Sequence, residues 1–367
     1  MNIRDDVMAV FRHRKPDRIP WLTYDIPYPM LPRGSWEREL RNKGLGLIGL
    51  MGFYPCGNVY ISKMPNVEIV QKVRIENKRT IISTTYNTPV GSVTKEEDFS
   101  ISPPNPWILK YPIKDVSDYK VVRFMVEDTV YEKNYDAFYW ADRHIGEDGF
   151  IRADCSSPFQ NLLIRFAGYQ RLLVDLYKHR EQVEDLLSIM EEKYFEVIRI
   201  LAESPVEVIG IDGNVNGRIT DPKLFSKYLL PLYQKASEIL HSKDKIVSVH
   251  MDGALSPLTD LIPETGIDVV EAFTPPPMGD LSLKEARNAW GDRIIIEANF
   301  PENVCLQGVD AIKKFTLDIL KQVAPGDSFI LSVTEDIPYR APNDVLEASL
   351  RAITEVMWKH GRYPIKI

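Results

Sequence analysis

The segment from Lys245 to Glu271 constrains the fold more than any other part of the chain. It begins with a short apolar run that reads as a buried strand and ends on His250. A helix is predicted from Leu255 to Ile262, and a second strand from Ile267 to Val270 ends on Glu271. Two strands joined by a helix over so few residues form a parallel pair with a right-handed crossover. The segment therefore predicts an α/β fold with an active site at these two strand ends.

The same alternation of strands and helices recurs along most of the chain. A long amphipathic helix is predicted from Glu181 to Glu203, and another from Asp221 to His241, where Asp221 is the N-cap. Eight strands are predicted to start near Ile19, Asn58, Ile151, Val206, Lys245, Ile267, Ile294 and Phe329. In a chain of 367 residues, this pattern predicts a (β/α)8 TIM barrel that forms one domain over residues 1–367.

One segment departs from the alternation of strands and helices. Val67 to Ile75 largely alternates between apolar and polar residues, and Thr80 to Tyr86 is rich in β-branched residues. Together with the stretch Thr88 to Val93, this pattern predicts an antiparallel hairpin or meander. We expect an insertion on the barrel, at about residues 63–115, rather than a barrel strand.

Composition excludes several classes of protein. The formal net charge is −7 and no basic run is present, which argues against a nucleic-acid partner. No apolar run approaches the roughly 20 residues needed to cross a membrane. The first residues are charged, so we expect no signal peptide. Three scattered cysteines are too few for a disulfide framework, which favours a reducing cytoplasm.

Acids and one histidine gather at the predicted ends of the strands, where TIM barrels carry their active sites. A single acid at such a place often caps a helix or bonds a loop. The ends of barrel strands converge, however, so the whole set predicts an active site. Seven predicted strands end on or beside such residues: Tyr24 and Asp25, Asp154, Asp212 and Asn214, His250 and Asp252, Glu271, Glu297, and Glu335.

His250 is the most informative single residue, because it follows an apolar strand and precedes a tight turn. It could act as a general base, bind a metal or pack in the core. Nitrogen and carboxylate ligands suit a catalytic zinc with an open position, and His250, Glu271 and Glu335 can supply such a set. Asp252 and Glu297 are competing ligands, and carboxylate-rich sets also fit other divalent metals.

The loop from Asp212 to Arg218 follows the fourth predicted strand. Its two glycines and two asparagines favour a bent loop that can adopt left-handed backbone conformations. It could be a plain connection between a strand and a helix. The functional interpretation is that Asp212 and Asn214 bind substrate.

The order of several short motifs resembles the uroporphyrinogen decarboxylase superfamily. These motifs are Phe11 to Pro20, Thr88 to Gly91, Asp221-Pro222, His250, and Thr334 to Val345. The resemblance covers nearly the whole chain and implies the same TIM-barrel fold. True decarboxylases resemble each other in an Arg-Gln-Ala-Gly-Arg stretch after the first strand, whose arginines hold the porphyrin carboxylates. In this chain that place holds acids and aromatic residues and no arginine.

The resemblance therefore points to the other branch, the cobamide-dependent methyltransferases. Members that act on thiols are similar in a His-x-Cys pair and a later Cys, all binding zinc. Here His250 matches the histidine, Asp252 stands at the first cysteine position, and Glu335 lies close to the last. Oxygen ligands leave a more Lewis-acidic metal, which suits a methyl donor with an oxygen or nitrogen leaving group. Demethylases of methoxylated compounds look like the closest analogue.

We therefore predict a methyltransferase that moves a methyl group from a small methylated donor, such as a methoxylated compound, to a corrinoid carried by a partner protein. Zinc or another divalent metal is predicted at His250, Glu271 and Glu335. Asp252 or Glu297 would act as a ligand or proton donor, and the predicted substrate contacts are Tyr24, Asp25, Asp212 and Asn214. The resemblance also suggests a homodimer.

Two alternatives stay open. The first is a metal-free decarboxylase or lyase acting on a smaller carboxylic acid, with His250 and the acids as general acids and bases. The second is a corrinoid- or tetrapyrrole-binding protein without catalysis of its own. A simple binding cavity would be mostly apolar, unlike these charged strand ends.

Overall fold

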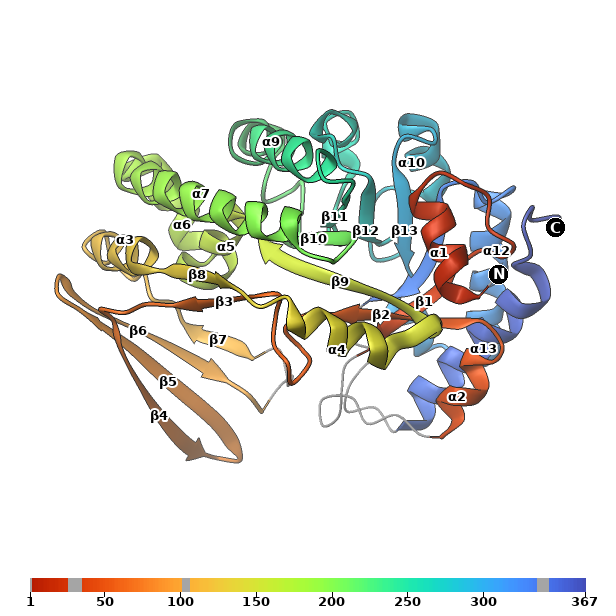
Figure 1. The fold of residues 1–367 in the computed structure, drawn as a ribbon, viewed down its shortest axis with the longest axis horizontal. Coiled ribbons are helices and arrows are strands. Elements are labelled where there is room, and N and C mark those ends of the chain that lie inside the picture. The colour runs from red at the N-terminus through yellow and green to blue at the C-terminus, as the bar shows by residue number, and fades with distance from the viewer. Residues whose placement is uncertain (1, 26–34, 101–105, 335–342) are drawn as a thin grey trace. The chain divides into compact units, whose positions relative to one another are not determined.

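The computed structural model describes residues 2–25, 35–100, 106–334 and 343–367 (Figure 1). The chain divides into two compact units. The first comprises Met1–Val59, Tyr135–Asp154 and Leu201–Ile367, and the second comprises Tyr60–Asn134 and Cys155–Ile200.

Eight strands close into a barrel, which confirms the predicted (β/α)8 fold. Around the barrel the order is β1, β14, β13, β12, β11, β10, β9 and β2. Their bounds are β1 Trp21–Asp25, β2 Leu45–Leu50, β9 Gly149–Ser156, β10 Val208–Asp212, β11 Ile246–His250, β12 Val269–Phe273, β13 Ile295–Asn299 and β14 Phe329–Val333. The helices between and after them include α2 Trp36–Arg41, α4 Asp136–Ile145, α9 Leu230–His241, α10 Leu283–Trp290, α12 Val309–Val323 and α13 Asn343–His360.

The N-terminal helix α1, Ile3–Phe11, closes the end of the barrel at which the strands begin. Val7, Val10 and Phe11 are buried in one apolar cluster with residues from the first positions of several strands, such as Val208 and Ile246. Burial of such side chains stabilises the fold by about 1.5–3 kcal/mol each. Because α1 fills this end, the opposite end of the barrel remains for polar chemistry.

The second barrel strand differs from the prediction, which placed it at Asn58 to Ser62. The barrel strand is β2, and the predicted stretch forms β3, Tyr60–Lys63, paired antiparallel with β8, Val130–Lys133. Glycine is unfavourable inside a strand, so Gly46 and Gly49 give β2 a sequence that does not predict a strand. Gly46 is required there, because a Cβ atom would lie 2.4 Å from Ile3 of α1.

The helix predicted from Leu255 to Ile262 is also wrong. Two short 3₁₀ turns take its place, Ser256–Leu258 and Ile262–Thr265. Pro257 and Pro263 limit an α-helix here to the few residues between them, because proline fits only the first turn of a helix and disfavours helical backbone in the residue before it. So short a helix is not stable by itself.

The second unit contains the predicted antiparallel insertion. β4 Glu68–Glu76, β5 Arg79–Thr88, β6 Gly91–Asp98 and β7 Trp107–Lys110 form a four-stranded sheet in chain order. Its helices are α3 Asp118–Asp128, α5 Pro158–Asn161, α6 Tyr169–Lys178 and most of α7 Arg180–Glu203. A π-helix, η2 Leu162–Ala167, joins α5 to α6.

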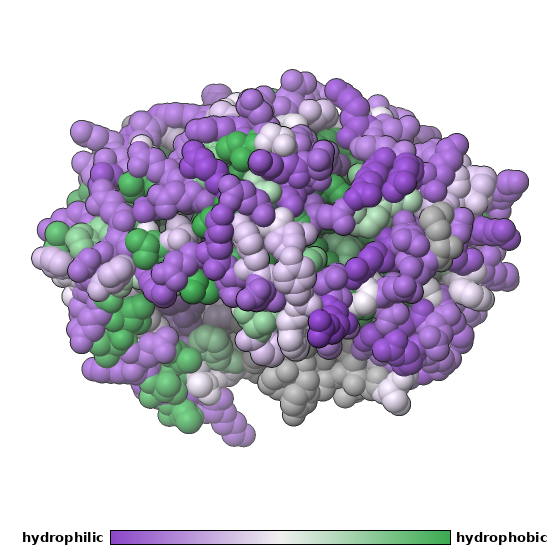
Figure 2. Space-filling model, in the orientation of Figure 1, coloured by the Kyte–Doolittle hydropathy of each residue, from purple (hydrophilic) through white to green (hydrophobic). Residues whose placement is uncertain are grey.

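The surface carries mostly hydrophilic residues on the face drawn in Figure 2. Within the described ranges, the helices are all too short or too polar to cross a membrane.

Candidate active site

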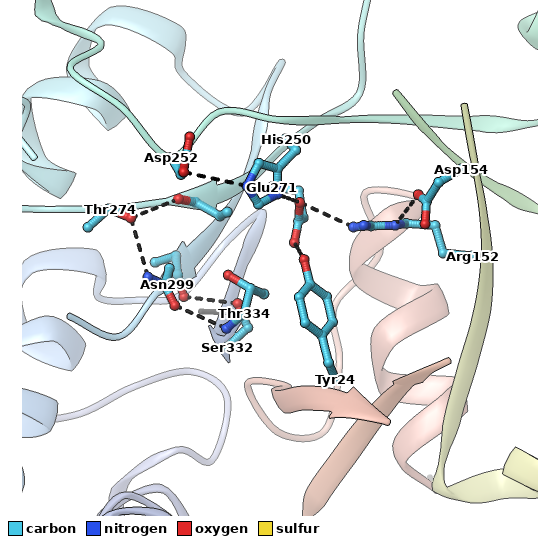
Figure 3. A network of polar contacts seen from close by, with 12 residues as sticks. Tyr24, Arg152, Asp154, His250, Asp252, Glu271, Thr274, Asn299, Ser332 and Thr334 are labelled. Carbon is cyan, nitrogen blue, oxygen red and sulfur yellow. Dashed lines mark hydrogen bonds and ion pairs between the residues drawn. The ribbon is translucent and has the colours of Figure 1, made fainter. Parts of the chain in front are cut away.

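Four strands of the first unit bring together a buried polar cluster (Figure 3). Tyr24 comes from β1, Arg152 from β9, His250 from β11 and Glu271 from β12. Glu271 lies at the centre of the cluster and is fully buried. A buried carboxylate is tolerated only where positive charges and hydrogen-bond donors surround it.

Glu271 has three such partners. Its Oε1 accepts a hydrogen bond of 2.6 Å from the Tyr24 hydroxyl, and its Oε2 lies 2.6 Å from Nδ1 of His250 and 3.2 Å from Nη1 of Arg152. Burial alone would raise the pKa of Glu271, but the charges of Arg152 and His250 and the hydrogen bonds lower it below its ordinary value. Glu271 is therefore a carboxylate.

His250 is held in its charged form by this carboxylate. Burial alone would lower the pKa of His250, but the negative charges of Glu271 and Asp252 and the hydrogen bond to Glu271 raise it well above its usual value. Nδ1 donates to Glu271, and Nε2 lies 3.7 Å from Oδ2 of Asp252. The imidazolium thus keeps a second N–H, on Nε2, on the side away from Glu271.

Arg152 also belongs to the cluster, and it was not among the site residues predicted from the sequence. Its side chain is buried, and the residue is only 3% exposed. Its Nε lies 2.7 Å from Oδ1 of Asp154, two residues later on the same strand. The guanidinium therefore links two carboxylates, Asp154 and Glu271. Alternation along a strand places residues two apart on one face, so the spacing of Arg152 and Asp154 was the available signal.

Gly210 of β10 makes room for this ion pair. A Cβ atom at Gly210 would lie 1.8 Å from Oδ1 of Asp154 and 2.8 Å from Nε of Arg152. Both distances are too short for any side chain, so only glycine fits at this position while the pair keeps its place.

Glu297 is a second buried carboxyl group, on β13, and it is 1% exposed. Burial, with the negative charge of Glu271 as the next cause, raises the pKa of Glu297 to about 8. Its Oε1 has no hydrogen-bond partner among the described residues. Glu297 is therefore protonated at neutral pH and can donate a proton.

The backbone next to Glu271 is strained. Ala272 has φ +59°, a left-handed conformation that costs an L-residue about 1–2 kcal/mol. The pairing of β12 with β13 shifts register between Val270 and Phe273, so Ala272 forms part of a bulge. Bulges often redirect side chains beside active sites. No local pattern in the sequence from Val269 to Phe273 indicates this bulge.

Asn299, the last residue of β13, links the segments that follow β12 and β14. Asn299 donates from Nδ2 to Thr274 at 3.3 Å, and its Oδ1 accepts from the backbone N–H of Thr334 at 3.0 Å (Figure 3). This places the end of β14 beside the loop that follows β12.

The structure brings together some of the predicted site residues and separates others. Tyr24, His250, Asp252 and Glu271 are adjacent, although Glu271 lies inside β12 and not at its end. Asp25 instead accepts a hydrogen bond of 2.8 Å from the Tyr54 hydroxyl.

The remaining predicted residues stand apart from these contacts or cannot be placed. Asn214 is exposed, with φ +44° in a loop whose backbone bonds to that of His250 and Gly253 through Val215. Glu335 and the side chain of Asp212 lie outside the described part of the chain.

The described donors suit a metal only in part. Within the ranges that the structure describes, no three His, Cys, Asp or Glu side chains are arranged to hold a metal ion. Both oxygens of Glu271 are engaged by protein donors. Nε2 of His250 and the carboxylate of Asp252, 3.7 Å apart, are the neighbouring atoms that could bind a metal. Glu271 would then be a carboxylate behind a metal-binding histidine, a common arrangement in metal sites.

Comparison with known proteins relates this architecture to others. The chain is similar to a methyltransferase from Methanosarcina mazei, with 15% identity, a TM-score of 0.61 and coverage of 97% of this chain and 99% of that one. At this identity the likeness shows a shared fold. Lower similarity is found with a chain of the pneumococcal virulence factor StrH, with 8% identity, a TM-score of 0.40 and coverage of 95% and 86%.

No curated protein matches the sequence significantly. The model of the uroporphyrinogen decarboxylase (URO-D) family matches residues 99–356, which is more than half of the chain. The protein therefore belongs to the uroporphyrinogen decarboxylase family.

Proposed function

We propose that this protein transfers a methyl group from a small methylated donor, such as a methoxylated compound, to a corrinoid carried by a partner protein. The observation that carries the proposal is the charged His250, which Glu271 holds through Nδ1 at 2.6 Å. A methyl group leaves oxygen or nitrogen readily only when that atom receives a proton or binds a Lewis acid. The proton on Nε2 of His250 meets this need.

Five side chains of this protein would take part in the transfer. As the methyl carbon passes to its acceptor, the bond to the donor's oxygen or nitrogen breaks and the electron pair stays on that atom. The Nε2 proton of His250 moves to it, and Glu271 stabilises the charged ring before transfer and fixes its orientation. Glu297 is a second proton source, because its carboxyl group is neutral below a pKa of about 8. Tyr24 and Arg152 hold Glu271 in place.

A divalent metal, with zinc as the first candidate, belongs to the same proposal. Such an ion would polarise the leaving atom as a Lewis acid. His250 and Asp252 would contribute ligands, with Glu335 as the predicted third. A metal on Nε2 would replace the proton there, so metal content separates the two forms of the proposal. The corrinoid partner and a homodimer are further parts of the proposal, which sedimentation with and without a corrinoid protein would test.

The experiment measures methyl transfer to reduced cobalamin by its absorbance, with a panel of methoxylated aromatic and aliphatic donors. The metal content of the purified protein is determined beside it. We expect transfer with at least one donor, and its loss in His250→Gln but not in His360→Gln, a control at the end of α13. A native protein without transfer to cobalamin across the panel would contradict the proposal.

Decarboxylation of a small carboxylic acid is the second candidate, and the buried Glu297 favours it. Loss of carbon dioxide leaves a carbanion that needs a proton, and a neutral carboxyl group can supply one. Release of carbon dioxide from small acids, abolished in Glu297→Gln, would select this function over methyl transfer.

A further inference from the structure

The second compact unit contains a cavity of about 230 Å³ of its own. It is lined by residues of β3, α3, β8, α5, η2 and α7 and by the last two residues of β9. An apolar cavity of about 150 Å³ is sufficient to bind benzene. The cavity in this unit therefore has room for one aromatic ring with a polar substituent.

Aromatic side chains form much of its wall. Tyr60, Tyr131, Phe166 and Tyr194 all line the cavity. The rings of Tyr60 and Tyr131 pack edge to face, with centroids 5.9 Å apart. Such walls bind flat apolar groups, because ring faces and edges attract one another. Burial, followed by the charge of Glu196, raises the pKa of Tyr131 to about 12, so its hydroxyl remains a hydrogen-bond donor.

Two polar groups on the wall indicate what the ring would carry. Lys193 lines the cavity with a side chain that is 16% exposed, and its Nζ lies 3.3 Å from Oε1 of Glu196. The Glu196 side chain is 45% exposed, so this ion pair is weak and the ammonium can also bind an anion. The Oδ1 atom of Asn161 is buried and has no hydrogen-bond partner in the described structure. Buried acceptors are usually satisfied, so this one is suited to a ligand donor.

The backbone beside the cavity supports a functional role. Phe166 belongs to η2, a π-helix of six residues that follows α5 directly. π-helical turns inside α-helices are rare and occur frequently at functional sites. Asn161 is the last residue of α5, so the same irregular segment supplies both the orphan acceptor and part of the aromatic wall.

We infer that this cavity binds a small aromatic acid that also carries a hydrogen-bond donor, of the hydroxybenzoate class. The ring packs against the tyrosine and phenylalanine side chains, the carboxylate pairs with Lys193, and the hydroxyl donates to Oδ1 of Asn161. The inference does not rest on the proposed methyl transfer, since every lining residue belongs to the second unit.

The test measures binding of 4-hydroxybenzoate to the whole protein by calorimetry. Its two matched probes are 4-hydroxybenzyl alcohol, which lacks the charge, and benzoate, which lacks the donor. We expect one site per chain, and a loss of affinity of about tenfold or more in Lys193→Met, because a buried charged hydrogen bond is lost. Asn161→Leu should weaken 4-hydroxybenzoate but leave benzoate unchanged. The control Lys178→Met, an exposed lysine of α6, should bind as the native protein does.

Other results would overturn the inference. The first is that 4-hydroxybenzoate does not bind the native protein, and the second is that the neutral alcohol binds with equal affinity. The third is that Lys193→Met has the same unfolding temperature as the native protein and still binds 4-hydroxybenzoate with unchanged affinity. Should Lys193→Met fail to fold, Val197→Phe fills the cavity from another lining position and should abolish binding. A loss of binding in His250→Gln with Lys193→Met unaffected would place the acid in the barrel and refute the cavity site.

Discussion

Nδ1 of His250 and Oε2 of Glu271 lie 2.6 Å apart on adjacent barrel strands. β11 and β12 pair in parallel with His250 opposite Glu271, so the contact follows directly from the register of the sheet. A histidine directly opposite a fully buried carboxylate stays charged, and the carboxylate stays ionised because Arg152 supports it. The two groups therefore titrate as one unit.

Replacing Glu271 by glutamine keeps its size but removes its charge. We expect the pKa of His250 to fall in Glu271→Gln, because the negative charge that raises it is gone. The free energy of unfolding should fall by roughly 3 kcal/mol, since Arg152 loses one of its two carboxylates. Titration of the histidine ring signals by NMR measures the pKa. Glu264→Gln, at an exposed position, is the control, and an unchanged His250 pKa in Glu271→Gln would refute this coupling.

Stability should decline as pH rises from about 4.5 to about 8. Glu297 binds its proton more tightly in the folded state than its ordinary pKa of 4.5 allows, so the unfolded chain loses that proton first. His250, whose folded pKa is also raised, adds a decline of the same sign above 6.5. Glu297→Gln removes the first part only.

Denaturant unfolding at several pH values measures this effect. We expect the Glu297→Gln curve to be flatter between pH 4.5 and 8 and to lie above the native curve at pH 8. Parallel native and variant curves would show that Glu297 is ionised in the folded protein.

Gly210→Ala should disturb the site, although it replaces no charged residue. Its Cβ would lie 1.8 Å from Oδ1 of Asp154, so the carboxylate must move away from Arg152. We expect a loss of about 1–3 kcal/mol in the free energy of unfolding, as for other overpacked sites. Adding Asp154→Ala should recover part of the loss, because the clash disappears. Strict additivity of the two changes would argue against a steric origin.

The hydroxyl of Tyr24 supplies one of the hydrogen bonds to the buried carboxylate. Tyr24→Phe leaves Oε1 of Glu271 without this donor, which should cost about 1–3 kcal/mol of stability. Tyr177→Phe changes the same group at a position that is 88% exposed, where we expect no measurable effect. Equal stability of the two variants would mean that another donor, such as water, replaces the Tyr24 hydroxyl.

The barrel could be predicted from the sequence because seven of its strands are short, largely apolar runs, most of them separated by helices that the sequence also predicts. β2 was the exception, since Gly46 and Gly49 reduce its strand signal. Their reason lies elsewhere in the chain: Ile3 and Leu22 pack where a Cβ atom of Gly46 would be. A requirement set by two distant segments is not visible in the local sequence.

The candidate site was predictable in part for the same reason. His250 ends its strand as predicted, and its neighbours Asp252 and Glu271 lie close to it. Arg152 was missed, because its pairing with Glu271 depends on the closed barrel that brings β9 and β12 together. Asp25 directly follows Tyr24 on β1, so alternation along the strand points its side chain to the opposite face, where it accepts a hydrogen bond from Tyr54.

Gly210 has a consequence for how this protein can diverge. Any other residue at position 210 would place its Cβ atom against the Asp154 carboxylate. A mutation that removes Asp154 would instead leave Arg152 with Glu271 as its carboxylate partner in the cluster. A mutation at position 210 alone or at position 154 alone gives a less stable protein, whereas mutations at both positions together can be tolerated. In descendants of this sequence, positions 210, 152 and 154 should therefore change together or not at all.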